Sequence, residues 1–444
     1  MIFADSVAVK AFEEGHEERL RITEAGFGSE LVAERQRVKL DRLWDRLADV
    51  PYYRGLPAVA ERAFTEAPLT PKAALKADPD RFLREGAGPY HKYYETSGTT
   101  SVPTPTPRLV EDTVLNTVSV ASLWSRVLRP GDRVASLLPS DVAPVCDLVA
   151  GVSEYLGCTM LRCYPFSQGM CDWDRLEVLF TRYRPEHVFA APGVLLQWTR
   201  VLKSRGRLAE VAAGVRSLML LGEVSTPPLR ARLAEQWGAR VLDASYGSTE
   251  TGTIAAACEH DRLHVLEHSH VAEVAEPGGE PVPAAPGAHG ELVVTPLNNH
   301  ARPLLRYGTG DLVTVGDGAG CDCGVALPVL TVHGRDTDGV ALGGTRLTAE
   351  AVERIVYTTP GVTGYLMQLK SSDPGAGRLL LERDVDFDSA VGTDPDELCR
   401  AVSERFAAEG VRWTAVALVG QLPQTTKAGG SQKNWKRTNV QWVD

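Results

Sequence analysis

RVASLLP, at residues 133–139, is the first of three short apolar runs that decide the fold class of this chain. HVFAAPG follows at 187–193 and SLMLLGE at 217–223, and segments of helical pattern such as PPLRARLAEQWG at 227–238 accompany them. Strands that alternate with helices are typical of a parallel, layered α/β domain. The sequence therefore predicts the α/β class.

The segments that precede and follow this stretch predict smaller structural units. Apolar residues recur at helical spacing through the first 90 residues until the turn around Asp49 and Pro51, which predicts an antiparallel helical opening. Residues 268–297 have the pattern of two strands joined by a Gly/Pro-rich loop. We therefore expect a β-rich subdomain beside the layered α/β domain.

The last hundred residues have a pattern of their own. LTAEAVERIVYT at 347–358 is helical in pattern, and RLLLERDV at 378–385 and WTAVALVG at 413–420 are strand-like. These elements predict a short α+β unit. We expect a large N-terminal domain over residues 1–335 and a small, mobile C-terminal domain over residues 336–444.

Composition excludes several classes of protein. Hydrophobic residues are 43% and charged residues 23% of the 444, which is ordinary for a globular enzyme. The 47 Lys and Arg against 57 Asp and Glu give a net charge of −10, so no general basic field exists for nucleic acid or an anionic membrane. The acidic N-terminus resembles no signal peptide, and no apolar run of about 18 residues occurs. We expect a cytoplasmic protein.

Eight cysteines are too few for a disulfide scaffold in so long a chain. Five of them stand singly among apolar residues, and we expect these to be small buried hydrophobic side chains: Cys146, Cys158, Cys163, Cys171 and Cys399. The other three are set apart by their spacing.

These three cysteines and one histidine have the pattern of a metal site. Cys258 precedes His264, and Cys321-Asp-Cys323 follows after a long gap. Three thiolates and an imidazole suit a closed tetrahedral zinc site, which would be structural because no position remains for a water. His260, His268 and His270 are alternatives to His264, and a zinc-free turn is the alternative to the whole site.

The loop YETSGTTSVPTP at residues 94–105 crowds hydroxyls around a glycine. Glycine permits close approach of backbone amides, and hydroxyls can donate to phosphate oxygens, so the loop suits a polyphosphate. It is not a Walker loop because no Gly-Lys-Ser/Thr follows at the required spacing. A plain surface loop is the alternative.

Three further motifs follow in order along the chain. ASYGSTE at 244–250 follows an apolar strand, so its polar residues would emerge at the carboxyl edge of a sheet. LRYGTGDL at 305–312 and HGRDTD at 333–338 come next. Together with the hydroxyl-rich loop, the set resembles the adenylate-forming superfamily of acyl-CoA ligases.

Within that superfamily the chain resembles the phenylacetate-CoA ligase-like branch. RQRVKLDRLWDRLADVPYYRG at 35–55, APLTPKAAL at 67–75 and LGEVS at 221–225 carry this resemblance, which runs from about residue 34 to the end. It implies that the hydroxyl-rich loop closes on the phosphates of ATP. The residues concerned are Ser97, Gly98, Thr99 and Thr100.

The resemblance also assigns roles to the later motifs. It implies that Tyr246 stacks on adenine, beside Gly247 and Ser248, that Thr249 lies near the α-phosphate and that Glu250 holds Mg²⁺. Asp311 would accept both ribose hydroxyls, with Arg335 beside the ribose. Gly222 and Glu223 would line the adenine and acyl pocket. The relatives also carry cysteines and histidines at positions similar to those of the zinc pattern.

The activity that the resemblance implies has two steps. A carboxylic acid, best an aryl or arylacetic acid, attacks ATP to give an acyl-adenylate, and a thiol, best that of coenzyme A, then accepts the acyl group. A carrier protein or an amine is an alternative acceptor, and nitrite is an alternative substrate for diazotisation. The partners are thus small molecules, without nucleic acid or membrane, and a homodimer is left open.

Two other classes of function stay as alternatives. Ser101 replaces the usual glycine of the phosphate loop, Gly308 interrupts the usual Tyr-Arg-Thr-Gly-Asp, and Thr337 takes the first position of the expected Asp-Asp hinge pair. These departures slightly favour a nucleotide-binding module without catalysis. A Cys/His zinc module on nucleic acid is disfavoured by the acidic balance of the chain.

The tail LPQTTKAGGSQKNWKR, at 422–437, resembles a family segment whose lysine reaches the phosphates during adenylation. Gln424 stands where the relatives carry arginine. Lys433, with Arg437 four residues later, best matches the family's Lys-x-x-x-Arg ending, while Lys427 lies nearer the expected distance from Pro423. We expect Lys433 to be the catalytic lysine, with Lys427 as the second choice and a solvated tail as the alternative.

Overall fold

The computed structural model describes residues 5–96, 103–335, 339–386, 394–423 and 439–443. The chain forms two compact units, one of residues 1–162 and 242–335 and the other of residues 163–241 and 336–444. The predicted division into 1–335 and 336–444 differs from this grouping and stays a prediction. Among the described residues, no helix is long and apolar enough to cross a membrane.

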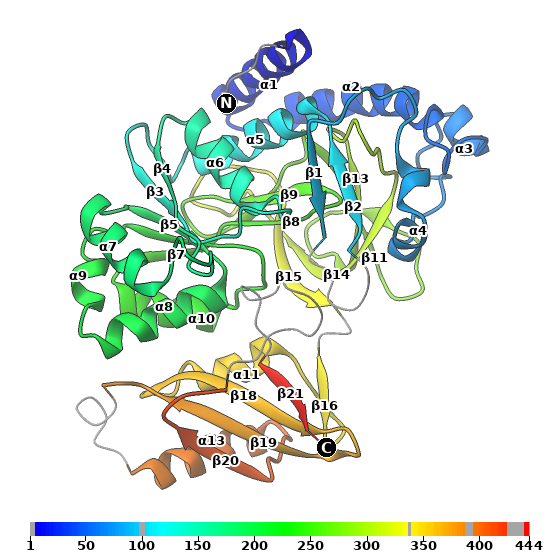
Figure 1. Ribbon diagram of the computed structural model, residues 1–444. Helices are drawn as coiled ribbons and strands as arrows, with labels where there is room; N and C mark the ends of the chain where they lie inside the picture. The colour runs from blue at the N-terminus through cyan, green and yellow to red at the C-terminus, as the bar shows by residue number, and fades with distance from the viewer. Residues whose placement is uncertain (1–4, 97–102, 336–338, 387–393, 424–438, 444) are drawn as a thin grey trace. The chain divides into compact units, whose positions relative to one another are not determined.

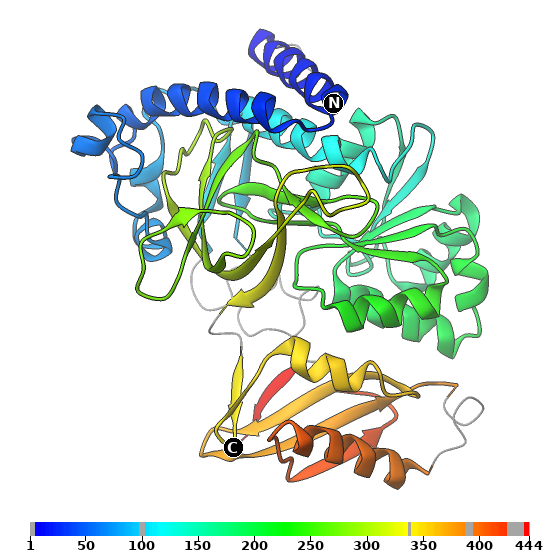
Figure 2. The same ribbon diagram turned by 180° about the vertical axis from the view of Figure 1, so that it is seen from behind.

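Helices open the first unit, as the periodicity predicts. α2 ends beside Asp49, at the predicted turn, and Figures 1 and 2 show α1 and α2 lying side by side. α5 is buried along most of its length, and Asp112 in its first turn accepts a hydrogen bond from the Leu109 amide at 2.9 Å. The helices of this unit are α1 (Ser6–Glu24), α2 (Ser29–Ala48), α3 (Pro57–Ala60), α4 (Lys72–Ala77), the 3₁₀ turn η1 (Pro79–Phe82), α5 (Val110–Trp124) and α6 (Val145–Tyr155).

An eight-stranded antiparallel sheet forms the centre of the first unit. Its strands lie in the order β12-β11-β13-β14-β15-β10-β9-β8. In β13 and β9 nearly every side chain is buried, so both faces of these strands are covered. The strands are β8 (Ser245–Ser248), β9 (Gly252–Ala257), β10 (Leu263–Val265), β11 (His270–Ala275), β12 (Val282–Pro283), β13 (His289–Pro296), β14 (Tyr307–Gly316) and β15 (Val329–Arg335).

Two smaller strand pairs complete the first unit. β1 (Lys92–Glu95) and β2 (Pro105–Arg108) form an antiparallel pair on either side of the predicted phosphate loop. β3 (Arg133–Ser136) and β4 (Thr159–Arg162) pair in parallel, with α6 between them in the sequence. This βαβ connection confirms the predicted strand at 133–139.

The second unit contains the other predicted parallel strands. β5 (His187–Ala190) and β6 (Ser217–Leu220) are fully buried and pair in parallel. α7 (Trp173–Tyr183), α8 (Pro192–Ser204), α9 (Leu208–Ala212) and α10 (Pro227–Trp237) surround them in the sequence, and β7 (Arg240–Asp243) follows. Buried strands that alternate with helices confirm the α/β class.

The C-terminal part of the second unit is an α+β layer. Its four-stranded sheet has the order β20-β19-β18-β21, with β18 and β19 antiparallel and both outer pairs parallel. Arg200 on α8 forms an ion pair with Glu382 on β19 at 2.6 Å. The elements are β16 (Val340–Leu342), β17 (Thr345–Leu347), α11 (Ala349–Val356), β18 (Val362–Lys370), β19 (Asp373–Arg383), α13 (Pro395–Ala408), β20 (Ala415–Val419) and β21 (Val440–Val443).

The prediction for the five single cysteines is wrong for three of them. Cys146 and Cys163 are buried as expected, whereas Cys158, Cys171 and Cys399 are partly exposed. Apolar neighbours in the sequence do not ensure burial. Cys158, for example, lies in the turn after α6, and its thiol donates to the Arg129 carbonyl at 3.4 Å.

Candidate active site and metal centre

Three of the predicted nucleotide-binding residues, on three strands of the eight-stranded sheet, lie together. The Tyr246 hydroxyl on β8 donates to Asp311 Oδ2 on β14 at 2.8 Å. Arg335 ends β15 directly opposite Asp311, and its Nε lies 3.4 Å from Asp311 Oδ1. Burial, and then the Asp311 charge, raise the pKa of Tyr246 well above its usual value, so the phenol stays a hydrogen-bond donor.

The turn that carries Thr249 and Glu250 is held through its backbone. Arg108 donates to the Thr249 carbonyl at 2.7 Å, and Asn299 donates to the Glu250 carbonyl at 3.0 Å. Gly247 permits the turn, because a Cβ there would lie 2.2 Å from the Gly252 carbonyl oxygen. Ser248 closes the turn by a hydroxyl contact with Thr251 at 3.0 Å.

The Glu250 carbonyl accepts hydrogen bonds, whereas its side-chain carboxylate has no hydrogen-bond or ion-pair partner among the described residues. Within the described ranges its carboxylate makes no hydrogen bond or ion pair, although the residue is only 5% exposed. A buried carboxylate normally has a cationic or hydrogen-bonding partner. Oxygen ligands of this type suit Mg²⁺, so the donor chemistry fits the predicted magnesium role.

Lys72 is a cation of this site that the sequence reasoning missed. It opens α4, and its Nζ donates to the Thr309 carbonyl on β14 at 2.9 Å. Burial lowers its pKa, and the nearby Glu250 and Asp311 charges raise it. The signal for Lys72 in the sequence is its place as the one charged residue of the otherwise apolar segment APLTPKAAL, directly after Thr-Pro.

The remaining predicted residues divide into two groups. Ser97, Gly98, Thr99 and Thr100 of the phosphate loop, and Lys427 and Lys433 of the tail, lie outside the described residues. Gly222 and Glu223 follow β6 in the second unit and are described with that unit alone.

The boundaries of the phosphate loop are well defined. The Thr104 amide donates to Thr96 Oγ1 at 2.9 Å, and the Thr96 amide donates to the Thr104 carbonyl at 3.2 Å. Thr104 is buried. The hairpin of β1 and β2 therefore fixes where the loop begins and ends.

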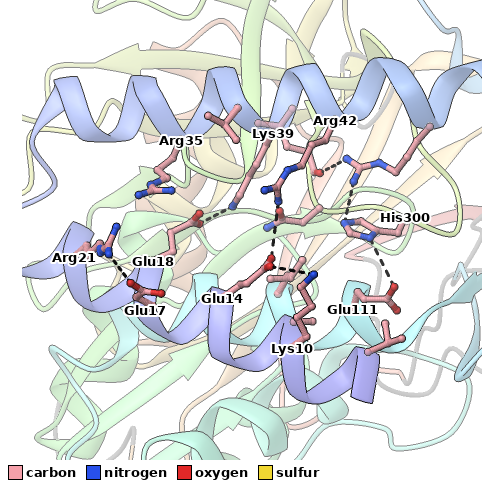
Figure 3. Close-up of a pocket in the computed structure, with 18 residues that line it drawn as sticks. Lys10, Glu14, Glu17, Glu18, Arg21, Arg35, Lys39, Arg42, Glu111 and His300 are labelled. Atoms are coloured by element: carbon pink, nitrogen blue, oxygen red, sulfur yellow. Dashed lines mark hydrogen bonds and ion pairs between the residues drawn. The ribbon is translucent and has the colours of Figure 1, made fainter. Parts of the chain in front are cut away.

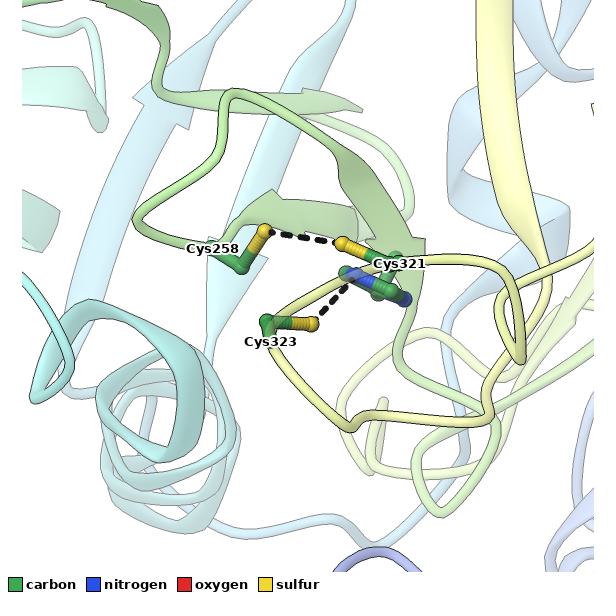
Figure 4. A group of neighbouring side chains, drawn as sticks. Cys258, Cys321 and Cys323 are labelled. Carbon is green, nitrogen blue, oxygen red and sulfur yellow. Dashed lines mark hydrogen bonds between the residues drawn. The ribbon is translucent and has the colours of Figure 1, made fainter.

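The structure brings the four predicted zinc ligands together. The ligand atoms of Cys258, His264, Cys321 and Cys323 all lie within 4.8 Å of one another. The sulfurs of Cys258 and Cys321 are 3.8 Å apart, and Cys323 Sγ lies 3.3 Å from His264 Nε2 (Figure 4). His264, on β10, is thus the imidazole of the group. His260, His268 and His270 do not belong to the group among the described residues.

Groups around this cluster orient and polarise it. His264 Nδ1 lies 2.9 Å from the Leu327 carbonyl, which leaves Nε2 for the cluster. The amides of His260 and Val325 donate to the sulfurs of Cys258 and Cys323, each at 3.4 Å. Burial raises the pKa of Cys323 to about 12 and lowers the pKa of His264, so the metal-free cluster would hold neutral groups.

An arginine ties the cluster to α5 and the loop that follows it. Arg126 forms a bidentate pair with Glu259, at 2.6 and 2.9 Å, and also donates to the Cys323 carbonyl. Two segments far apart in sequence therefore stay close at this point.

Comparison with known proteins agrees with the motifs. Residues 93–298 match the family described as AMP-binding enzyme. The phenylacetate-coenzyme A ligase of Thermus thermophilus is 29% identical over 278 residues, which are 61% of this chain and 60% of that enzyme. That of Escherichia coli is 26% identical over 234 residues, half of each chain. These matches support the adenylate-forming superfamily, and within it the phenylacetate-CoA ligase-like branch, as the group that this chain resembles. The match thus spans about three fifths of the Thermus enzyme's length.

Solved structures of the superfamily share the fold. 2-Hydroxyisobutyryl-CoA ligase, in a postadenylation complex with 2-HIB-AMP, has a TM-score of 0.78 at 19% identity, over 93% of this chain and 90% of that one. The anthranilate CoA ligase AuaEII, in complex with anthranoyl-AMP, has a TM-score of 0.52 at 18% identity, over 77% of this chain and 65% of that one. At 18–19% sequence identity, these structures support a shared fold and nothing more specific.

Proposed function

We propose that this chain activates a carboxylic acid with ATP to an acyl-adenylate and transfers the acyl group to a thiol, that of coenzyme A. The observation that carries the proposal is the cluster of Tyr246, Asp311 and Arg335 next to Lys72, in a chain that matches the AMP-binding family. The names of the relatives, phenylacetate-coenzyme A ligases, support an aryl or arylacetic acid as the substrate.

The chemistry needs positioning and positive charge more than proton transfer. A carboxylate is already a nucleophile, so it attacks the α-phosphorus without a general base while pyrophosphate leaves. Positive groups must then offset the negative charge that develops on the phosphate oxygens. Lys72 would supply one such group, and the loop of Ser97, Gly98, Thr99 and Thr100 would supply amide and hydroxyl donors.

Nucleotide binding would divide between the other residues. The Asp311 carboxylate has acceptor sites for both ribose hydroxyls, and Tyr246, which holds this carboxylate in place, would stack on adenine. Glu250 would hold Mg²⁺, which supplies charge neutralisation at the phosphates when it is bound. Gly222 and Glu223 would line the adenine and acyl pocket, and Lys433 or Lys427 would approach the α-phosphate.

The deciding experiment is acid-dependent exchange of labelled pyrophosphate into ATP, over a panel of substituted benzoic and arylacetic acids. We expect exchange with at least one acid, and coenzyme A thioester formation with the same acid. Asp311→Asn should raise the KM for ATP by roughly tenfold or more, because a hydrogen bond to a charged group contributes about 1.5–3 kcal/mol. Asp317→Asn, at an exposed position just after the same strand, is the matched control.

Each contrary outcome points to a named alternative. ATP binding without exchange for any acid would mean a nucleotide-binding module. Exchange only with nitrite would refute the carboxylate substrate, and an adenylate that coenzyme A does not discharge would point to a carrier protein or an amine. An Asp317→Asn effect equal to that of Asp311→Asn would refute the ribose assignment.

We also propose that Cys258, His264, Cys321 and Cys323 bind one structural zinc ion. Three soft sulfur donors and one oriented imidazole fit tetrahedral zinc, and four protein ligands leave no position for a substrate or water. The proposal is tested by metal analysis of the purified chain and of its ligand variants.

A further inference from the structure

A cavity of about 500 Å³ lies between α1, α2 and the start of α5, within the first unit (Figure 3). Residues Leu297, Asn298 and His300 also line it. The cavity is walled by ionic side chains: α2 contributes a row of cations at helical spacing, α1 contributes carboxylates together with Lys10 and Arg21, and α5 contributes Glu111. The cations of the row are Arg35, Lys39, Arg42 and Arg46 on α2, and the carboxylates are Glu14, Glu17 and Glu18 on α1.

The carboxylates of α1 neutralise only part of the cationic row. Lys39 is paired, with its Nζ 2.6 Å from Glu18 Oε1. Arg42 reaches Glu14 only at 3.9 Å. Arg35 makes no hydrogen bond or ion pair to any described residue, and Figure 3 draws no contact from it. Two guanidinium groups are therefore left with little or no counter-charge.

The cavity wall also contains buried donors without acceptors. Arg35 Nε, Arg46 Nε and Asn298 Nδ2 are buried atoms with no hydrogen-bond partner among the described residues. Asn298 is only 7% exposed. All three atoms are donors, and burying a donor without a partner is unfavourable. A missing acceptor, and specifically a negatively charged one, would satisfy both the donors and the cations.

We propose that this cavity binds a small anion carrying a phosphate group, with Arg35 and Arg42 as its cationic partners and Asn298 as an orienting donor. Guanidinium groups match phosphate oxygens because their planar N–H groups can donate two at a time. The volume lies within the usual range of small-molecule sites, roughly 300–1,000 Å³. Burial lowers the pKa of Arg46 to about 10, as expected where buried cations lack enough negative charge.

The cavity wall is linked to the backbone of the candidate active site. Asn298 and His300 line the cavity, and Asn299 between them donates to the Glu250 carbonyl at 3.0 Å. Asp112 holds the same segment by accepting from the His300 amide at 2.5 Å. An anion that fixes Asn298 would thus also fix the backbone that positions Glu250. This link rests on the proposed function, and it makes the cavity an effector site.

Binding is tested by thermal unfolding with inorganic phosphate at constant ionic strength, in the presence of a saturating non-hydrolysable ATP analogue that occupies the nucleotide site. We expect a saturable rise in the unfolding midpoint for the wild type. The rise should be lost in the double variant Arg35→Gln with Arg42→Gln. It should persist in Arg37→Gln, an exposed position on the same helix.

Several outcomes would overturn the proposal. These are no shift in the wild type, an equal shift in the double variant, or a shift with succinate and none with phosphate, since a dicarboxylate lacks the phosphate group. If the double variant does not fold, Arg35→Gln alone is decisive, because Arg35 has no partner to lose among the described residues.

The effector role is tested by pyrophosphate exchange. Phosphate should lower the KM for MgATP about fivefold in the wild type, the low end of common coupling between sites, and leave the double variant unchanged. An unchanged KM in the wild type would refute the coupling. Failure of the proposed function is distinct from this result, because exchange would then be absent in every variant while the phosphate-dependent unfolding shift remained.

Discussion

Glu353 is a buried carboxylate whose titration should set the pH dependence of stability in the second unit. It lies on α11, where Oε2 accepts from the Thr226 hydroxyl and Oε1 accepts from the Tyr365 hydroxyl at 3.3 Å. The residue is 6% exposed. Burial raises its pKa from 4.5 to about 7; the two hydroxyls oppose this shift, and the Glu223 charge adds to it.

The sign and size of the effect follow from linkage. Because the folded state holds the proton more tightly than the unfolded chain, the stabilising contribution is complete below pH 4.5 and is lost as pH rises through about 7. The difference between a pKa of 4.5 and about 7 corresponds to about 3 kcal/mol in total, of which roughly 2.5 kcal/mol falls between pH 5 and pH 8. Glu353→Gln cannot ionise, so it should not lose this amount.

The assay compares urea unfolding of the wild type and Glu353→Gln at pH 5, 6, 7 and 8, with hydrogen exchange of α11 read by mass spectrometry to localise the change. Relative to the wild type, the variant should gain roughly 2.5 kcal/mol between pH 5 and pH 8. Glu404→Gln, an exposed carboxylate on α13, should follow the wild type. Parallel pH profiles for the wild type and Glu353→Gln would refute the neutral buried carboxylate. A variant that gains stability relative to the wild type between pH 8 and pH 5 would refute the sign of the effect.

Three further predictions concern the metal and the catalytic cations. The purified chain should hold about one zinc ion, and a chelator should lower its free energy of unfolding. Cys321→Ser should bind zinc much more weakly. Unchanged zinc affinity in this variant would show that the ligand set is wrong. Lys72→Met should slow pyrophosphate exchange by roughly a hundredfold, the effect of losing one electrostatic stabiliser, and a normal rate would leave Lys72 a structural donor to Thr309. Lys433→Ala should slow adenylation by roughly a hundredfold and spare thioester formation from a supplied acyl-adenylate, with Lys427→Ala tested separately; equal loss in both half-reactions would indicate misfolding.

The parts of the fold that could be predicted are those with a strong local pattern. The runs at 133–139, 187–193 and 217–223 became β3, β5 and β6, because short buried strands are apolar on both faces. Helix α10 begins at the Thr-Pro pair and ends at Gly238, whose left-handed backbone (φ 59°) stops it. Such signals act over a few residues, so one sequence is enough to read them.

The metal cluster could be predicted for a different reason. Thiols and imidazoles are rare in this chain and chemically distinctive, so their spacing alone selects few combinations. The choice between His264 and its neighbours could not be made, because it depends on which side chain β10 directs toward the loop of Cys321 and Cys323. Pairing of β10 with β9 and β15 decides that.

Lys72 shows why some site residues cannot be predicted from the sequence. Its position depends on the Thr70 hydroxyl, which donates to the Leu305 carbonyl at 2.6 Å across 235 positions of the chain. Such a long-range contact leaves no periodicity or motif. A lysine at the start of a helix is otherwise indistinguishable from a solvated surface residue.

Some charged side chains of this chain have ion-pair partners, and others have none among the described residues. Arg306 and Glu273 are both buried and form a bidentate pair at 2.9 and 3.0 Å, so each charge is compensated and neither is available to a ligand. Glu250 is equally buried, yet only its backbone is held, and its carboxylate has no partner among the described residues. Arg35 is the cationic counterpart, with its helix fixed and its guanidinium unpaired in the same sense. A charged group without a hydrogen-bonding partner can take one from a bound ligand, which is why we propose Mg²⁺ for Glu250 and an anion for Arg35.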